Sequence, residues 1–287
     1  MNPEISKLAP GLYFVATPIG AARDITLRAL DVLASADILA AEDTRSLRKL
    51  MDIHGIPLAG RRIVAYHDHS AQAVQARLCA AVTDGKSVAY ASEAGMPLVA
   101  DPGFELGRAV AASGGFVTVA PGASAPLAAL AISGLPSDAF FFGGFLPSAS
   151  SARKKRLQAL SKVPGTLIFF ESPKRLAATL RDAAGTLDAG REAVICREIP
   201  KKFEEVRRGT LAELETRFAE TPARGEIVLL IGRGHSEKIS ESDLEDALGS
   251  ALKTMSVKDA ARSVADTHDL PRRKVYQLAL QLEKAGR

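Results

Sequence analysis

The sequence predicts an α/β fold made of two α/β units and a small helical appendage. Three observations support this. Short apolar runs alternate with amphipathic helical patterns through residues 12–119, and the alternation restarts at residue 139. Such alternation is typical of crossover connections and a mostly parallel sheet. After residue 234 only helical patterns follow, so we expect domains at 1–121, 122–235 and 236–287.

Length and composition agree with a globular protein. A chain of 287 residues corresponds to two domains at about 150 residues each. With 47% apolar residues a disordered chain is excluded. Cys79 and Cys196 lie far apart without ligand spacing, which excludes a disulfide scaffold and a structural zinc site. There is no uninterrupted apolar span and no secretory signal, so we expect a cytoplasmic protein.

The first unit is expected to contain five strands and three helices. Thr26 precedes an amphipathic stretch and is a suitable N-cap for it. The expected strands cover residues 12–16, 38–41, 63–65, 88–91 and 116–119, and the expected helices cover residues 27–33, 71–82 and 104–112.

The second unit repeats the architecture without repeating the sequence. We expect a hinge at residues 121–124, where proline and glycine interrupt the pattern. The expected strands cover residues 139–142, 166–170, 193–196 and 226–231, and the expected helices cover residues 153–160 and 175–184.

The appendage is expected to contain three helices. The first covers residues 240–252 with Ser240 as N-cap, the second covers 256–265, and Pro271 opens the third at a favoured first position. The first helix is acidic and the last is basic, which resembles a helix-turn-helix. A docking or packing element is the alternative.

Polar and Gly/Pro clusters follow all five strands of the first unit. Ligands of parallel α/β sheets bind at the carboxyl ends of the strands, so five such loops would line one crevice. Any one of these loops could be turn chemistry alone, but together they favour a site. The clusters begin at Thr17, Glu42, His67, Ser92 and Pro121, and Asp101-Pro102-Gly103 lies close behind the fourth.

Common ligand motifs are absent from these loops. Neither the GxGxxG fingerprint of dinucleotide sites nor a P-loop occurs, so the NAD and P-loop nucleotide classes lose their main support. Residues 122–126 nearly form a nucleophile elbow around Ser124, but Pro126 replaces the last glycine. His67 and His69 would share a face of an extended segment, yet polar packing explains them more simply than a metal. We expect no metal and retain His67 as a general base or substrate contact.

Basic residues gather at four places in the chain. A solvated face is the simple interpretation of each cluster, and a phosphate contact is the alternative. The clusters are Arg153 to Arg156 at a helix start, Arg197 with Lys201 and Lys202, and Arg207 with Arg208; a further run, Arg272 to Lys274, lies in the appendage. Tryptophan is absent and tyrosine numbers four, which argues against a base-stacking platform.

Several of these motifs together resemble the tetrapyrrole-methylase-like (class III) S-adenosylmethionine methyltransferases, and within them a branch that acts on small-subunit ribosomal RNA. The similarity extends over nearly the whole chain. It rests on residues 12–20, 24–30, 41–45, 67–69, 92–97, 101–103, 121–125, 134–137, 144–147, 171–172, 197–198 with 201, and 225–227. The chain departs from the family pattern at Ala21, Glu93 and Met96, where the family usually has Asn, Asp and Thr.

The resemblance implies two α/β domains with S-adenosylmethionine held in the cleft between them. It also implies methylation of a cytidine ribose 2′-hydroxyl in the decoding region of 16S rRNA, and a homodimer. A weakly acidic hydroxyl needs a base near the transition state. The candidates for this base are Glu42, Asp43, His67 and Asp101, although Asp43 and Asp101 could instead cap the following helix or turn.

The remaining site residues are predicted by function. The cofactor candidates are Pro18, Ile19, Gly20, Ser92, Glu93, Ala94, Gly95, Ser124, Ala125, Phe145, Leu146, Glu226 and Ile227. The RNA-binding candidates are Arg45, Arg153, Lys154, Lys155, Arg197 and Lys201.

Three other functions stay open on sequence alone. A methyltransferase of a tetrapyrrole or another small molecule would share the fold without needing the appendage. A non-enzymatic RNA-binding assembly protein would not need the five converging loops. A serine hydrolase would depend on Ser124.

Overall fold

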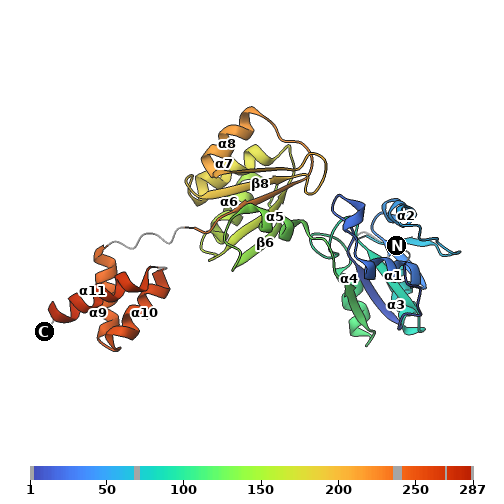
Figure 1. Ribbon diagram of the computed structural model, residues 1–287, viewed down its shortest axis with the longest axis horizontal. Coiled ribbons are helices and arrows are strands. Elements are labelled where there is room, and N and C mark those ends of the chain that lie inside the picture. The colour runs from blue at the N-terminus through green and yellow to red at the C-terminus, as the bar shows by residue number, and fades with distance from the viewer. Residues whose placement is uncertain (1–2, 68–71, 235–240, 269, 286–287) are drawn as a thin grey trace. The chain divides into compact units, whose positions relative to one another are not determined.

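The computed structural model describes residues 3–67, 72–234, 241–268 and 270–285. It comprises two compact units, Met1–Arg233 and Gly234–Arg287 (Figure 1). Within the described residues, no helix has the length and apolar character that crossing a membrane requires.

The first sheet of unit Met1–Arg233 is entirely parallel. It contains β1 (Gly11–Val15), β2 (Ile38–Ala41), β3 (Ile63–Ala65), β4 (Ser87–Ala91) and β5 (Val117–Ala120), in the order β3-β2-β4-β1-β5. The central strands β1 and β4 are buried at every position, because helices cover both faces of the sheet. The five predicted strands are confirmed, each within one residue at either end.

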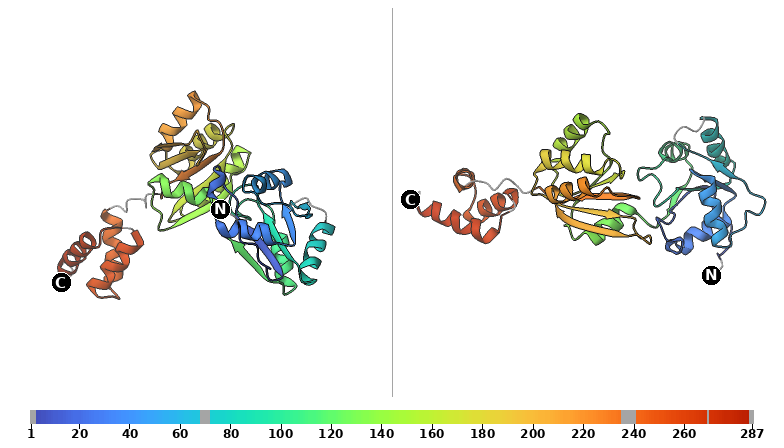
Figure 2. Two further views of the ribbon diagram at one scale, coloured as in Figure 1. Left: turned by 45° about the vertical axis from the view of Figure 1, so that its right-hand side comes forward. Right: turned by 90° about the horizontal axis from the view of Figure 1, so that it is seen from above.

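Four helices cover this sheet, two on each face (Figure 2). The short 3-10 helix η1 (Ala22–Asp24) and α1 (Leu27–Ser35) follow β1, and α2 (Thr44–Ile53) follows β2. Helices α1 and α2 pack on one face, while α3 (Gln72–Thr83) and α4 (Phe104–Ala112) pack on the other. Thr26 accepts a hydrogen bond from Ala29 N at 3.2 Å, which confirms the predicted N-cap.

The second sheet is mixed, so the prediction of a mostly parallel sheet is wrong here. Its strands are β6 (Phe140–Phe145), β7 (Thr166–Glu171), β8 (Glu192–Arg197), β9 (Glu205–Thr210) and β10 (Ile227–Ile231), in the order β6-β7-β10-β8-β9. Only β6 and β7 pair in parallel. The connection from β8 to β9 is too short for a parallel crossover, so these two strands form a hairpin.

Helices also cover both faces of the second sheet. Helix α5 (Ala125–Ser133) packs on one face, and α6 (Ser150–Leu160), α7 (Leu176–Leu187) and α8 (Leu211–Glu220) pack on the other (Figure 1). α2, α5, α8 and β9 were not among the elements expected from the sequence. Helix α8 carries a capping box in which Thr210 and Glu213 exchange side-chain to backbone hydrogen bonds.

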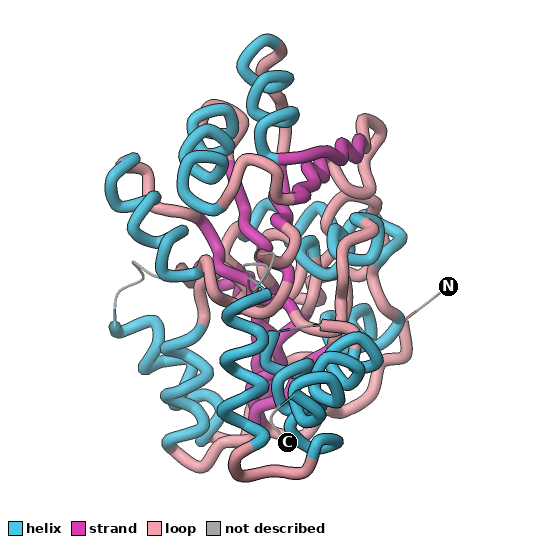
Figure 3. Tube along the Cα trace, turned by 90° about the vertical axis from the view of Figure 1, so that its left-hand side faces the viewer, coloured by secondary structure: helices cyan, strands magenta, loops and turns pink. Residues whose placement is uncertain are grey.

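The unit Gly234–Arg287 contains three helices and no strand in its described part (Figure 3). They are α9 (Glu241–Leu252), α10 (Val257–His268) and α11 (Arg272–Ala285), which confirms the predicted helices. Leu248, Val264 and Val275 bring one residue from each helix into a separate hydrophobic core. Ser256 accepts from Asp259 N at 3.2 Å and caps α10, whereas the predicted cap Ser240 lies outside the described residues.

Candidate functional site

The site lies where the connections after two neighbouring parallel strands run to opposite faces of the first sheet. β1 leads into α1 on one face and the adjacent β4 leads into α4 on the other, which opens a crevice at their carboxyl ends. The loops that follow the two strands are joined there. Thr17 N donates to Gly95 O and Gly95 N donates to Thr17 O, both at 3.0 Å.

Buried hydroxyl groups tie these two loops together more tightly. Ser92 Oγ donates to Gly95 O at 2.6 Å, and Thr17 Oγ1 donates to Ser92 O at 3.3 Å. Gly95 has φ +84°, a left-handed conformation that favours glycine. A Cβ there would also lie 3.2 Å from Ile19 Cγ2. The crevice therefore has a rigid floor.

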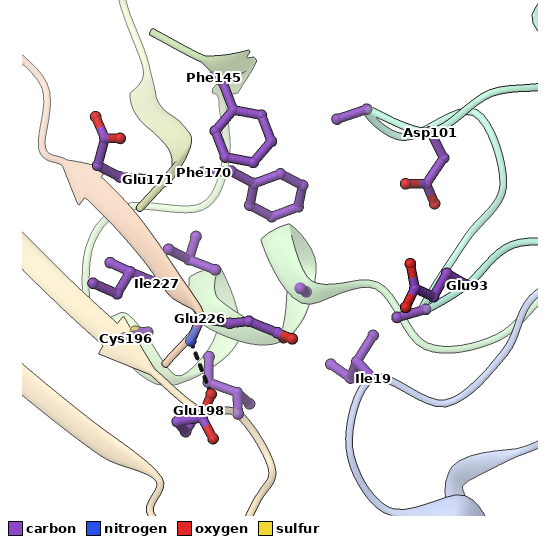
Figure 4. Close-up of a pocket in the computed structure, with 15 residues that line it drawn as sticks. Ile19, Glu93, Asp101, Phe145, Phe170, Glu171, Cys196, Glu198, Glu226 and Ile227 are labelled. Carbon is purple, nitrogen blue, oxygen red and sulfur yellow. Dashed lines mark hydrogen bonds between the residues drawn. The ribbon is translucent and has the colours of Figure 1, made fainter. Parts of the chain in front are cut away.

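A cavity of about 390 Å³, which we name the central cavity, lies above this floor. Its walls come from both sheets. Figure 4 shows Ile19, Glu93 and Asp101 on one side, and Phe145, Phe170 and Glu226 on the other. The lining residues are Ile19, Glu93, Ala94, Ala100, Asp101, Ala125, Phe145, Phe170, Glu171, Cys196, Glu198, Ile199, Glu226, Ile227 and Val228.

The central cavity is strongly acidic on the side of the first sheet. Burial, together with the negative charges of Glu42 and Glu93, raises the pKa of Asp101 to about 7. The loop that carries Asp101 is also strained, because Leu98 and Ala100 both adopt positive φ values, of 69° and 63°. A carboxyl group with this pKa changes its charge near neutral pH, as a catalytic or ligand-binding group would.

On the side of the second sheet, the acidic groups are held by hydrogen bonds. Glu198 Oε1 accepts from Glu226 N at 2.8 Å (Figure 4). Lys201 Nζ lies 3.3 Å from Glu198 Oε1 and 3.1 Å from Glu226 Oε2, so it bridges the two carboxylates. The backbone N–H of Glu226 is the main cause that lowers the pKa of Glu198. These contacts keep Glu198 ionised and fix the rim of the cavity.

The end of β7 adds a second fixed carboxylate. The Glu171 side chain is fully buried, accepts from Thr179 Oγ1 at 2.6 Å and from Ser172 N at 2.8 Å, and lies 3.3 Å from Arg175 Nε. Arg175 Nη2 in turn donates to Leu146 O at 2.5 Å. Phe145 and Phe170 stand beside this network with ring centroids 5.5 Å apart. They form an apolar wall.

A smaller hollow of about 220 Å³, which we name the side cavity, lies beside the same loops. Glu93 lines both cavities. Helix α2 forms the outer wall of the side cavity, and the loop after β1 forms the inner wall. The lining residues are Thr17, Pro18, Gly20, Ala22, Ser46, Leu47, Lys49, Leu50, Ile53, Ser92 and Glu93.

Most of the predicted cofactor residues line the central cavity or the side cavity. Gly95, Ser124 and Leu146 line neither: Gly95 pairs with Thr17, Ser124 precedes α5, and the Leu146 side chain is buried in the core of the second sheet. The central cavity takes Ile19, Glu93, Ala94, Ala125, Phe145, Glu226 and Ile227, and the side cavity takes Pro18, Gly20, Ser92 and again Glu93.

Sequence reasoning missed the second-sheet residues of the central cavity apart from Phe145, Glu226 and Ile227. Phe170 and Glu171 end a strand that was predicted, so the rule about carboxyl ends would have found them had it been applied to the second unit as well. Cys196 and Val228 give no such signal, because they are ordinary strand residues that reach the cavity only through the pairing of β8 with β10.

Of the four predicted catalytic residues, only Asp101 lines the central cavity. Asp43 caps α2, accepting from Arg45 N at 2.7 Å and pairing with the Arg45 guanidinium at 3.1 Å. This is the capping alternative that the sequence left open. Glu42 does not line the central cavity, yet its charge acts on Asp101. His67 is exposed after β3, and its neighbours Asp68 and His69 lie outside the described residues.

The predicted RNA contacts also differ among themselves. Arg153 is 4% exposed and its Nη2 lies 2.6 Å from Asp182 Oδ2, which contradicts a phosphate contact. One of the basic residues at the start of α6 is therefore a partner in a buried ion pair. Arg197 is paired with Glu205 at 3.0 Å. Lys201 is paired with Glu198 and Glu226 at the edge of the central cavity. Arg45, Lys154 and Lys155 are exposed, although Arg45 also pairs with Asp43 and Lys154 lies 3.6 Å from Asp182.

The structure also bears on two chemistries that the sequence did not favour, a serine hydrolase and a metal site. Ser124 lines neither cavity, which removes the basis for a hydrolase site there. Among the described residues, no group of three or more His, Cys, Asp or Glu side chains could hold a metal ion.

Comparison with known protein families gives two matches along the chain. Residues 11–215 match the tetrapyrrole (corrin/porphyrin) methylases, and residues 239–283 match the RsmI C-terminal HTH domain. The first segment contains every strand of the two sheets except β10, and the second lies within the unit Gly234–Arg287.

Solved structures share the fold at low sequence identity. The crystal structure of the methyltransferase CobJ has a TM-score of 0.59 and 17% identity, and the alignment covers 80% of this chain and 97% of that one. The crystal structure of diphthine synthase also has a TM-score of 0.59, with 15% identity, 77% coverage of this chain and 89% of that one. At this identity the likeness shows the fold alone.

Curated relatives are much more similar in sequence. The ribosomal RNA small subunit methyltransferase I of Mesorhizobium japonicum is 48% identical over 278 residues, covering 96% of this chain and 93% of the relative. The protein of that name from Vibrio cholerae is 41% identical and covers 98% of both chains. The chain therefore belongs to the ribosomal RNA small subunit methyltransferase I family, which has the tetrapyrrole methylase fold.

Proposed function

We propose that this protein transfers a methyl group from S-adenosylmethionine to the ribose 2′-oxygen of a cytidine in the decoding region of 16S rRNA. The observation that carries the proposal is the extent of the match. Relatives named ribosomal RNA small subunit methyltransferase I align with 96% to 98% of the chain, whereas the CobJ structure covers 80%. A small-molecule methyltransferase would not account for the remaining helices.

The central cavity suits the cofactor. Its volume of about 390 Å³ lies within the usual range for small-molecule sites. The sulfonium and ammonium groups of S-adenosylmethionine are cationic and match an acidic lining, while Phe145 and Phe170 offer an apolar wall for the adenine. Bound there, the cofactor supplies an electrophilic methyl group. Ala94 and Ala125 contribute small side chains to its lining.

Asp101 is the residue that we assign to accept the proton of the ribose hydroxyl. A general base works best when its pKa lies near the working pH, and the pKa of Asp101 is about 7. Asp101 also lines the cavity, so it can lie within reach of the acceptor. When the ribose oxygen takes the methyl group that the bound cofactor would supply, the Asp101 carboxylate would accept the proton of the hydroxyl.

Glu42 is expected to adjust the charge of Asp101 without receiving the proton itself. In Glu42→Gln, the loss of one neighbouring negative charge should lower the pKa of Asp101. The acidic limb of kcat/KM against pH should then move to lower pH, with turnover at pH 8 reduced less than roughly tenfold. Steady-state kinetics from pH 5.5 to 9 would measure this. A loss of turnover above about 100-fold at pH 8, with cofactor affinity intact, would make Glu42 the base.

An RNA substrate requires groups that bind its phosphates. Arg45, Lys154 and Lys155 are the exposed candidates for this role.

We also propose that the protein acts as a homodimer, and that it does so in the cytoplasm, where ribosomal subunits are assembled. Analytical ultracentrifugation would measure the oligomeric state.

Transfer of labelled methyl groups tests the function directly. Small ribosomal subunits and naked 16S rRNA, both unmodified, would be offered in parallel, and nuclease mapping would locate the label. Label on a cytidine ribose 2′-oxygen is the expected result. Cofactor binding without label on either RNA would favour a small-molecule acceptor, and the absence of cofactor binding would favour an assembly protein.

A further inference from the structure

We propose that the side cavity binds one ribonucleotide of the RNA substrate, with its phosphate at Lys49 and its sugar or base against Leu50 and Ile53. The proposal rests on the function given above and assigns part of the acceptor site, which neither the family match nor the sequence motifs identify.

The place of the side cavity is the first argument. The loop after β1 separates the two cavities, because Ile19 lines the central cavity while Pro18 and Gly20 line the side cavity. Glu93 belongs to both. Methyl transfer requires donor and acceptor to be close and in line, so the acceptor strand must occupy space that adjoins the donor. The side cavity is such a space.

The surface of α2 is the second argument. Ser46, Lys49, Leu50 and Ile53 are spaced three, four and seven residues apart, so they share one face of the helix, and all four line the side cavity. The neighbouring stripe of Arg45, Arg48 and Asp52 lines neither cavity. Helix α2 thus turns one defined stripe toward the side cavity.

The charges of the two stripes differ in a way that favours a phosphate at Lys49. Arg48 Nε is paired with Asp52 Oδ1 at 2.9 Å, and Arg45 is paired with Asp43 at 3.1 Å. Lys49 forms no ion pair with any residue in the described ranges. Its ammonium group is exposed and available to an anion.

The rest of the lining is divided between apolar and polar groups. Ile53 is 56% exposed at the end of α2 and, with Leu50, offers an apolar surface to a sugar or base. Thr17 and Ser92 are buried and already use their hydroxyl protons within the protein. Ser46 and Glu93 remain as groups that can meet a polar edge of a nucleotide. Apolar surface beside one cation and a few polar groups suits a nucleotide.

The far wall of the side cavity is anchored to the same helix. His54 follows α2, and its Nε2 lies 2.9 Å from Ala22 O, which belongs to the opposite wall. Gly20 is closely covered as well, since a Cβ there would lie 2.9 Å from Lys201 Cγ and Pro200 Cδ. The hollow is therefore bounded by two segments held in place.

The test compares Lys49→Ala with Arg48→Ala, a matched change one residue away on the stripe that lines neither cavity. Lys49→Ala should raise KM for unmodified small subunits roughly fivefold to tenfold and reduce the slope of log KM against log salt by about 1. The Kd for S-adenosylmethionine, measured by calorimetry, should stay within about twofold of wild type, as should kcat. Arg48→Ala should leave all four quantities near wild type.

A second pair of variants examines the apolar side. Ile53→Ala should raise KM for the RNA substrate, whereas Leu27→Ala, an equally exposed change on α1 that lines neither cavity, should not. Both residues are more than half exposed, so neither change endangers folding.

Three results would overturn the proposal. Lys49→Ala and Arg48→Ala could weaken RNA to the same extent, which would indicate diffuse electrostatic attraction. Lys49→Ala could raise the Kd for S-adenosylmethionine while KM for RNA stays constant, which would give the side cavity to the cofactor. Both side-cavity variants could match wild type. If wild type itself transfers no methyl group to RNA, the proposed function fails instead, and the two failures are thereby distinguished.

Discussion

Asp101→Asn is expected to abolish most of the activity while making the cofactor-free protein more stable. If Asp101 receives the ribose proton, turnover at saturating cofactor should fall roughly 100-fold to 10,000-fold. The variant also removes a negative charge from an acidic cavity, so the Kd for the cationic cofactor should rise about tenfold. Asparagine is close to isosteric with aspartate, so the walls of the central cavity should keep their shape.

The gain in stability follows from the sign of the pKa shift. The pKa of Asp101 is raised from 3.8 to about 7, so the folded state holds a proton that the unfolded state has released between these values. The contribution of Asp101 to the free energy of unfolding therefore falls as pH rises from about 4 to about 7, and this loss is fully present above pH 7. Asp101→Asn removes this loss of stability, because an asparagine side chain does not ionise. The free energy of unfolding at pH 8 should increase by about 1–3 kcal/mol, and wild type and variant should converge near pH 4.

Urea unfolding at pH 4.5 and pH 8, together with single-turnover kinetics, measures both effects. Glu105→Gln is a suitable control, since Glu105 is an exposed carboxylate on α4 that lines neither cavity. If turnover at saturating cofactor survives in Asp101→Asn while the Kd rises, Asp101 binds the cofactor and a different group takes the proton.

Asp182→Ala is expected to destabilise the second sheet and its helices by about 3–5 kcal/mol, because it leaves the Arg153 guanidinium buried without its carboxylate. Arg153 and Asp182 are 4% and 8% exposed in their side chains, and Arg153 Nε donates to Asp182 Oδ2 at 2.8 Å. Arg153 Nη1 also donates to Pro147 O at 3.2 Å and to Ser148 O at 3.0 Å. The pair therefore joins α6, α7 and the loop behind Phe145.

The matched control is Glu215→Ala, which breaks an ion pair between a partly buried carboxylate and an exposed arginine. Arg181 Nε lies 3.1 Å from Glu215 Oε1, but the Arg181 side chain is 67% exposed, so the expected loss is below about 1 kcal/mol. Urea denaturation at pH 7.5 compares the two variants. Equal losses would show that burial of the Arg153 ion pair contributes nothing beyond a surface pair.

Local signals in the sequence were enough for the elements that have a strong pattern and a cap. The strands of the first sheet are short apolar runs between turn residues, and Thr26 caps the start of α1, so both could be located from the chain alone. α4 was predicted with its observed bounds. The loops after these strands converge because parallel strands place their carboxyl ends at one edge.

The missed elements lacked such signals. β9 contains Glu205, Arg207 and Arg208, so its sequence resembles a solvated loop, and it becomes a strand by pairing with β8. α5 is apolar on every side and has little periodicity. α2 follows the Glu42-Asp43 cluster directly, and a capping role of Asp43 was only one of two alternatives there, so the sequence alone did not predict the helix. Strand pairing and burial, which are nonlocal, decided these cases.

The sequence by itself determined the α/β class, the two sheets, the family and most of the loops that meet at the central cavity, because periodicity, caps and motifs are local properties. Only the tertiary structure decided which role each of several residues with the same type of side chain has. Arg153 is an interior ion-pair partner while Lys154, its neighbour, is exposed. Asp43 is a helix cap, whereas Asp101 lies half-buried among carboxylates with its pKa raised to about 7. The physical reason is that burial and neighbouring charge set the protonation and availability of a side chain, and both arise from segments far apart in the chain.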